Sequence, residues 1–171
     1  GYHRFWVSEH HNHPTIVGTA PEVIMAAIGQ ATARIRIGSA GVMLPHYATY
    51  KVAEQFRVLE AIAPGRIDLG VGRAPGSDGK TAYALNPNGQ HFSEHFPANV
   101  RDLEAWVSGV PLVDGHAFGE LKAHPFGPQA PEVWMLGTSD YGAQVAAHLG
   151  LPYCFAHFIT DGRGVERAFQ L

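Results

Sequence analysis

Three histidines and one carboxylate lie close together near the start of this chain, in the run Glu9-His10-His11-Asn12-His13. Imidazole titrates near neutral pH, so one of these histidines could donate or accept a proton in a reaction. Three imidazoles could instead hold a metal ion, although no cysteine and no HExxH-type spacing accompanies them. A polar loop with one hydrogen-bonded histidine is a third interpretation. The residues alone leave all three open, and we favour acid–base chemistry or ligand contact over metal binding.

Two other segments carry groups that suit a phosphate. Arg73 follows an apolar run and has small neighbours, and its planar guanidinium can donate two hydrogen bonds to a phosphate. The run Gly137-Thr138-Ser139-Asp140-Tyr141-Gly142 offers hydroxyl groups and, if a helix begins there, free backbone N–H groups. A surface arginine and an ordinary Ser or Asp helix cap are the plainer alternatives. Both segments together favour a phosphorylated ligand.

A third segment, Gly38-Ser39-Ala40-Gly41, is made of small residues. Small residues at a strand end let a flat ligand approach the backbone, but a glycine bulge needed for sheet packing has the same pattern. The pair Gly70-x-Gly72 lacks the spacing of a dinucleotide fingerprint.

The elements that must position these groups alternate between strand and helix. Short β-rich runs predict strands at 4–8, 34–38, 66–71, 132–136 and 153–156. Helical spacing of apolar residues predicts helices at 19–31, 49–61, 93–107 and 141–149, and a last one from Gly164. Thr19 is the expected N-cap of the first helix, with Glu22 completing a capping box. Residues 73–90 are expected to be irregular, and 109–130 to be an excursion with local strands.

Strands separated by single crossover helices form a parallel sheet, which makes the fold class α/β. Parallel sheets bind ligands at the carboxyl ends of their strands, and the segments described above all follow predicted strands. Histidines in the remaining loops are expected to face solvent, namely His46, His91, His95, His116 and His124.

Composition narrows the class of protein. The chain has 171 residues, enough for one domain but short of the ~250 that a closed (β/α)₈ barrel usually needs. A net charge of -3 provides no basic field for nucleic acid, and no apolar run reaches the ~20 residues of a membrane span. Cys154 is the single cysteine, which favours a reducing, cytoplasmic location. The first residue is Gly1 and no signal peptide is evident, so we expect a fragment or a processed product.

Four motifs, in this order, resemble the bacterial luciferase-like flavin monooxygenases, and most closely their single-chain oxidoreductase subgroup. They are Phe5-Trp6-Val7-Ser8-Glu9-His10-His11; Ile37-Gly38-Ser39-Ala40-Gly41-Val42-Met43-Leu44-Pro45; Pro64-Gly65-Arg66-Ile67-Asp68-Leu69-Gly70-Val71-Gly72-Arg73-Ala74-Pro75-Gly76; and Leu136-Gly137-Thr138-Ser139 through Gly150-Leu151-Pro152. The resemblance implies a TIM (β/α)₈ barrel that binds FMN at the carboxyl ends of its strands. The predicted strands match the second to sixth of eight, so residues 1–171 are expected to form one incomplete barrel domain that lacks the first strand and the last two.

The resemblance also implies roles for particular residues. His10 matches the active-site histidine of the family, and Glu9 and His11 flank it. Ala40 and Gly41 match a pair joined by a non-prolyl cis peptide beneath the flavin ring. The residues that match the flavin-phosphate site are Arg73, Thr138, Ser139 and Gly142. Gly72 stands where luciferase proper carries a reactive cysteine, which argues against light emission. No metal is implied.

The activity implied by the resemblance is an FMN-dependent monooxygenase. Reduced FMN would come from a separate flavin reductase, and O₂ and a small organic molecule would be the substrates. Relatives are commonly dimers, so a homodimer is expected. Two alternatives stay open: a deazaflavin-dependent hydride-transfer oxidoreductase, and a non-catalytic flavin-binding or inactive fragment.

Overall fold

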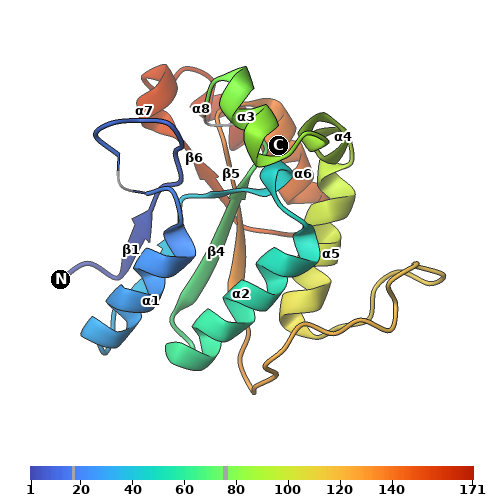
Figure 1. Ribbon diagram of the computed structural model, residues 1–171. Helices are drawn as coiled ribbons and strands as arrows, with labels where there is room; N and C mark the ends of the chain where they lie inside the picture. The colour runs from blue at the N-terminus through green and yellow to red at the C-terminus, as the bar shows by residue number, and fades with distance from the viewer. Residues whose placement is uncertain (17, 75–76) are drawn as a thin grey trace.

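The computed structural model describes residues 1–16, 18–74 and 77–171, and its centre is a parallel β-sheet (Figure 1). The strands run in the order β1-β2-β4-β5-β6, and the short β3 pairs with β4 beside this path. Their bounds are β1 Arg4–Val7, β2 Arg36–Ser39, β3 Val42–Met43, β4 Ile67–Gly72, β5 Glu132–Gly137 and β6 Tyr153–Phe155. Because neighbours in the sheet follow chain order, the sheet winds in one direction, as in a barrel, rather than reversing as in a doubly wound fold.

Long helices connect successive strands, and short helices lie at one end of the sheet. The bounds are α1 Pro21–Ala31, η1 Leu44–His46, α2 Thr49–Ile62, α3 Gly79–Leu85, α4 Gly89–Glu94, α5 Phe96–Ser108, α6 Asp140–Leu149, α7 His157–Thr160 and α8 Val165–Ala168. Figure 1 shows α3, α4, α7 and α8 gathered at the top, the end toward which β4 points. The short helices therefore surround the carboxyl ends of the strands, where the sequence places the ligand.

The hydrophobic core lies between the sheet and the long helices. On β4, Ile67, Leu69 and Val71 are fully buried in one cluster with Val52 and Phe56 of α2. Full burial of each such side chain contributes about 1.5–3 kcal/mol. The side chains between them on β4 point to the opposite face, because successive residues of a strand alternate. We call this opposite face the inner face.

A network of charges ties four strands together on the inner face. Asp68 of β4 is fully buried and accepts hydrogen bonds from Arg4 Nε at 3.0 Å, Trp6 Nε1 at 2.8 Å and Arg36 Nε at 2.9 Å. Glu132 of β5 accepts a further bond from Arg4 Nη2 at 2.7 Å. A buried carboxylate is tolerated only when such partners replace its hydration, so these bonds hold β1, β2, β4 and β5 in one arrangement.

The first helix begins differently from the prediction. Thr19 is not its N-cap: α1 begins at Pro21, and Ala20 takes the cap position without a side-chain hydrogen bond. Proline suits the first helical position because the N–H that it lacks would have no partner there. Glu22 accepts a hydrogen bond from Gln55 Nε2 of α2, so it supports helix packing rather than a capping box.

The segment after β4 is more ordered than expected. Residues 73–90 are not irregular throughout, because α3 lies within them and α4 begins at Gly89. Asp78 caps α3 by accepting hydrogen bonds from Lys80 N and Thr81 N. The helix expected from residue 93 is two helices, because α4 ends at Glu94 and α5 begins at Phe96.

The excursion 109–130 is fully described and contains no strand, contrary to expectation. Side-chain bonds to its backbone hold it against the helices instead. Arg57, which is 2% exposed, donates to the carbonyls of Pro125 and Gln129 in the excursion and to that of Val107 in α5. Trp106 Nε1 donates to Leu121 O. These bonds attach the excursion to α2 and α5 without strand pairing.

Within the described residues, no helix has both the length and the apolar character that crossing a membrane requires.

Candidate functional site

A buried carboxylate organises the loop that follows β1. Glu9 is only 1% exposed, and its Oε2 accepts a hydrogen bond from Met43 N at 3.0 Å. Its Oε1 accepts from Tyr47 Oη at 2.7 Å and lies 2.7 Å from His11 Nε2. The ring of His11 in turn meets that of His46 edge to face, with centroids 6.0 Å apart. We call Glu9, His11, His46 and Tyr47 the histidine cluster.

The loop folds tightly against the strand end that carries it. His10 N donates to Gly18 O at 2.9 Å, and a Cβ added at Gly18 would lie 2.2 Å from Ser8 O. Because β1 ends at Val7, strand alternation does not reach His10 and His11, and a loop sets their directions instead. His10 is half-buried, and nine-tenths of the His11 side chain is buried.

Tyr47 donates to Glu9 throughout the ordinary pH range. Burial raises the pKa of its phenol well above the ordinary value, and the hydrogen bond to Glu9 raises it further. The hydroxyl therefore keeps its proton and offers it to the carboxylate.

Small residues lie between β2 and β4 at their carboxyl ends. The Ala40–Gly41 peptide is cis, as the resemblance implies. A Cβ at Gly41 would lie 2.8 Å from Gly70 O, and one at Gly70 would lie 2.1 Å from Ser39 O, so neither position tolerates a side chain. Gly72 is open, since the nearest atom to a Cβ there would be Leu136 O at 3.8 Å. We call Ala40, Gly41, Gly70 and Gly72 the glycine floor, which is closely packed at Gly41 and Gly70 and leaves free space at Gly72.

The other predicted residues meet at the beginning of α6. The guanidinium carbon of Arg73 lies 4.1 Å from the ring centroid of Tyr141 in the first turn of this helix. Ser139 is the N-cap, but its side chain makes no capping hydrogen bond. Backbone N–H groups of the first turn and the positive end of the helix dipole are therefore left to attract an anion, with Arg73 beside them.

The neighbours of this anion site also suit a negative ligand. Asp140 lies at the first position of α6, but Arg167 of α8 pairs with it at 2.6 Å and offsets its charge. Thr138 is half-buried at the end of β5. Gly142 is buried, and a Cβ there would lie 3.3 Å from the ring of Tyr153, so a larger residue would press on β6.

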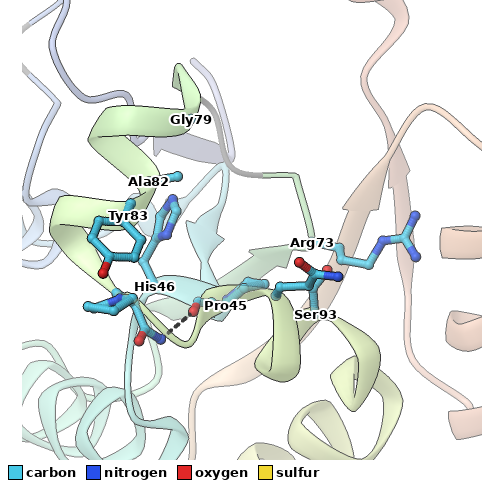
Figure 2. Close-up of a pocket in the computed structure, with 11 residues that line it drawn as sticks. Pro45, His46, Arg73, Gly79, Ala82, Tyr83 and Ser93 are labelled. Carbon is cyan, nitrogen blue, oxygen red and sulfur yellow. Dashed lines mark hydrogen bonds between the residues drawn. The ribbon is translucent and has the colours of Figure 1, made fainter.

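A pocket of about 380 Å³ borders both groups of residues. Figure 2 shows His46 and Tyr83 together on one side, and Arg73 on the other with its side chain extending away from them. Asn86 closes the base by donating from Nδ2 to Pro45 O at 2.8 Å. His46 is 6% exposed, so the expectation that it faces solvent is wrong: η1 carries it inward.

The tertiary structure adds residues that sequence reasoning missed. Tyr47 and His46 belong to the histidine cluster, and Tyr141 lies beside Arg73 at the anion site. No spacing in the sequence links these three residues to Glu9 or Arg73. Residues Pro75 and Gly76, which end the third family motif, lie outside the described residues. Among those described, no three His, Cys, Asp or Glu side chains are placed to hold a metal ion.

Comparison with known proteins identifies a family for this chain. A family model described as "Luciferase-like monooxygenase" matches residues 1–170. The chain is 45% identical over 174 residues to N-acetyl-S-alkylcysteine monooxygenase of Bacillus subtilis, covering 99% of this chain and 52% of that protein. It is 42% identical over 168 residues to a luciferase-like monooxygenase of Escherichia coli K12, covering 94% of this chain and 47% of that protein. The chain thus spans about half the length of the curated relatives it matches.

Solved structures show the same fold. Apo-MsnO8 aligns with a TM-score of 0.87 and 39% identity, over 99% of this chain and 49% of its own. Two further structures are 19% identical to this chain, a level at which the likeness shows the fold alone. The names of these two proteins give different cofactors. The oxygenating constituent of 3,6-diketocamphane monooxygenase of Pseudomonas putida is in complex with FMN, with a TM-score of 0.66 over 89% and 47% of the chains. An F420-dependent secondary alcohol dehydrogenase has a TM-score of 0.72 over 91% and 49%.

The expectation of an incomplete TIM barrel is confirmed, because the sequentially ordered parallel sheet aligns with about half of these larger proteins. Which strands of the full barrel are missing stays a prediction. The family match spans nearly the whole chain, and the relatives above exceed 40% identity. The chain therefore belongs to the luciferase-like monooxygenase family.

Proposed function

We propose that this chain provides the flavin site of an FMN-dependent monooxygenase, in which reduced FMN and O₂ oxidise a small organic substrate. The observation that carries the proposal is the anion site at the beginning of α6, with Arg73 stacked on Tyr141 beside it. It lies at the same end of the sheet as the glycine floor. An anion site next to a flat backbone surface suits a ligand with a phosphate tail and a planar ring.

The residues fit FMN in both parts. Arg73, Thr138, Ser139 and the N–H groups near Gly142 would hold the phosphate, because they combine a cation, hydroxyl groups and a helix N-terminus. Ala40 and Gly41 would lie against the ring, since neither residue has a side chain larger than a methyl group. When bound in reduced form, FMN would supply the electrons that activate O₂.

The chain would contribute binding, orientation and proton handling. His10 is the proposed catalytic residue and would set the protonation of the reacting group, with Glu9 and His11 beside it. The pocket bordered by His46, Tyr83 and Arg73 would receive the organic substrate. A separate flavin reductase would deliver reduced FMN.

A flavin titration tests the cofactor. Purified chain is titrated with FMN, riboflavin and the deazaflavin F420, and binding is followed by fluorescence. FMN should bind more tightly than riboflavin, which lacks the phosphate. Loss of a charge-assisted hydrogen bond costs about 1.5–3 kcal/mol, so Arg73→Ala should weaken FMN binding about 10- to 100-fold and leave riboflavin unchanged.

Arg34→Ala is the matched control, because Arg34 is an exposed arginine just before β2, at the opposite end of the sheet. Unchanged FMN affinity in Arg73→Ala would remove the phosphate assignment. Tight binding of F420 without binding of FMN would instead support deazaflavin-dependent hydride transfer.

Substrate oxidation tests the activity. An N-acetyl-S-alkylcysteine is the first substrate to try, because the Bacillus subtilis relative is named a monooxygenase of that class. The assay supplies FMN, NADH and a flavin reductase and measures product by mass spectrometry. General acid–base catalysis contributes about 10²–10⁴-fold, so His10→Ala should lower product formation by at least 10²-fold. An unchanged rate would exclude that role.

A further inference from the structure

We propose that His11 exchanges its proton with the bound ligand at Nδ1, and that Glu9 and Tyr47 are positioning residues that keep a proton on Nε2. The inference rests on the proposed function and deepens it. It gives a role to a second histidine of the same site and names the ring nitrogen through which its proton moves. Neither the sequence motifs nor the comparisons assign a role to Tyr47.

The assignment follows from counting donors and acceptors around Glu9. Tyr47 Oη has one proton, and its 2.7 Å contact with Glu9 Oε1 uses it. His11 Nε2 lies 2.7 Å from the same carboxylate oxygen and 3.4 Å from Tyr47 Oη. Both of these neighbours therefore act as acceptors toward Nε2. Only a protonated Nε2 can satisfy them, so His11 is held with N–H at Nε2.

The other contacts of Glu9 leave its Oε1 to Tyr47 and His11. Its side chain is 1% exposed, and its second oxygen is occupied by Met43 N at 3.0 Å. Tyr47 keeps its proton and donates it to Glu9, because burial and the hydrogen bond to Glu9 raise the pKa of its phenol. A buried carboxylate that orients an imidazole is a recurrent way to direct the chemistry of the other ring nitrogen.

Proton exchange is thereby confined to one atom. Neutral His11 and its imidazolium both donate from Nε2 to Glu9, and they differ only at Nδ1. In the described part of the chain, the hydrogen bonds of the His11 ring all involve Nε2. An acidic group of the ligand would pass its proton to Nδ1, becoming an anion while His11 becomes a cation beside Glu9, and the reverse step would restore both.

Nitrogen-15 NMR of the full chain, labelled at histidine, tests the assignment without measuring activity. His11 should show a pyrrole-type Nε2 and a pyridine-type Nδ1, with no averaging between tautomers. Glu9→Gln and Tyr47→Phe should move both shifts toward the averaged values of free imidazole. Tyr50→Phe is the matched control, because it removes a tyrosine hydroxyl that donates to Lys122 O at 3.0 Å, away from His11. A pyridine-type or averaged Nε2 in the unmodified chain would overturn the proposal, even if the variants fail to fold.

Anaerobic addition of reduced FMN then tests the contact with the ligand. The Nδ1 shift of His11 should move on saturation, whereas the ring nitrogens of His116, which contacts Asp102 near the excursion, should not. If reduced FMN saturates the chain and the Nδ1 shift of His11 does not move, the inference is refuted and the proposed function is left intact. Absence of FMN binding would remove the proposed function and the ligand contact together, while the wild-type tautomer would still be decided by the first measurement.

Discussion

Replacing Asp68 with Asn takes a negative charge out of the inner face while keeping the shape of the side chain. Asp68 is fully buried and accepts four hydrogen bonds, three from the guanidinium groups of Arg4 and Arg36 and one from the indole of Trp6. An amide offers one acceptor oxygen, and its NH₂ group would face two of these donors, because each oxygen of Asp68 accepts two of the four bonds. The substitution therefore leaves donors without acceptors in a network that joins β1, β2 and β4.

The expected loss of stability is smaller than the sum of the broken bonds. Hydrogen bonds to charged groups contribute about 1.5–3 kcal/mol each, and breaking a buried ion pair costs about 3–5 kcal/mol. Two features reduce that figure here: the side chains of Arg4 and Arg36 are 33% and 20% exposed, and both retain Glu132. Because Asn keeps one acceptor as well, we expect Asp68→Asn to lower the free energy of unfolding by about 2–4 kcal/mol.

Urea denaturation followed by tryptophan fluorescence measures this loss. With a slope of about 2 kcal/mol per molar urea, the midpoint should fall by about 1–2 M. Glu132→Gln is the control: its carboxylate joins the same network but is 42% exposed, so the cost should be about 0–1 kcal/mol. A midpoint for Asp68→Asn within about 0.3 M of the unmodified chain would refute the reasoning, as would an equal loss in both variants.

Three further substitutions test separate parts of the structure. Gly70→Ala should prevent folding, because the new Cβ would lie 2.1 Å from Ser39 O; circular dichroism and soluble yield measure this. Arg57→Ala should increase protease cleavage within residues 109–130 about 10-fold or more, because it removes two bonds from a buried side chain to backbone carbonyls of this segment, those of Pro125 and Gln129. Tyr47→Phe should change how stability depends on pH. The folded state raises the pKa of Tyr47 above 10.0, so its contribution is complete below pH 10 and declines above it. Urea titrations should show that the variant lacks this decline of about 1.4 kcal/mol per pH unit.

Each of these predictions has a control in the same chain. Gly79→Ala should fold normally, since nothing lies within 4 Å of the added Cβ, and a folded Gly70→Ala would contradict the packing argument. Arg101→Ala removes a more exposed arginine and should not alter cleavage of the excursion. Tyr50→Phe should keep the alkaline decline, and equal slopes for Tyr47→Phe and the unmodified chain would show that Tyr47 is not its source.

Most of the sheet could be predicted from local pattern. The five predicted strands correspond to β1, β2, β4, β5 and β6. Short β-rich runs bounded by glycine and proline rarely form other secondary structure. The missed strand, β3, has only two residues and carries no periodicity. Thr19 is not the N-cap of α1 because Pro21 favours the first helical position. The helix predicted from residue 93 is divided because Pro97 favours the first turn of a new helix, α5.

The site was predictable only where the chemistry lies next to a strand end. Arg73 and Ser139 both follow strands, and parallel strands bring their carboxyl ends together, so their approach at α6 was foreseeable. Tyr47 was not foreseeable, because it lies 38 residues from Glu9 and reaches it only after η1 turns inward. His46 was expected in solvent for the same reason: its burial depends on η1 and on α4, which packs against η1.

The sequence by itself determined the alternation of strand and helix, the end of the sheet at which a ligand is expected, and the residue types present there. These properties follow from periodicity and from the small set of connections that a parallel sheet allows. Only the tertiary structure decided which side chains meet: His11 with Glu9 and Tyr47, Asp68 with its charged partners, and Arg73 with the ring of Tyr141. Each depends on atoms distant in sequence, and a hydrogen bond or an ion pair forms only when packing fixes both partners within about 3 Å.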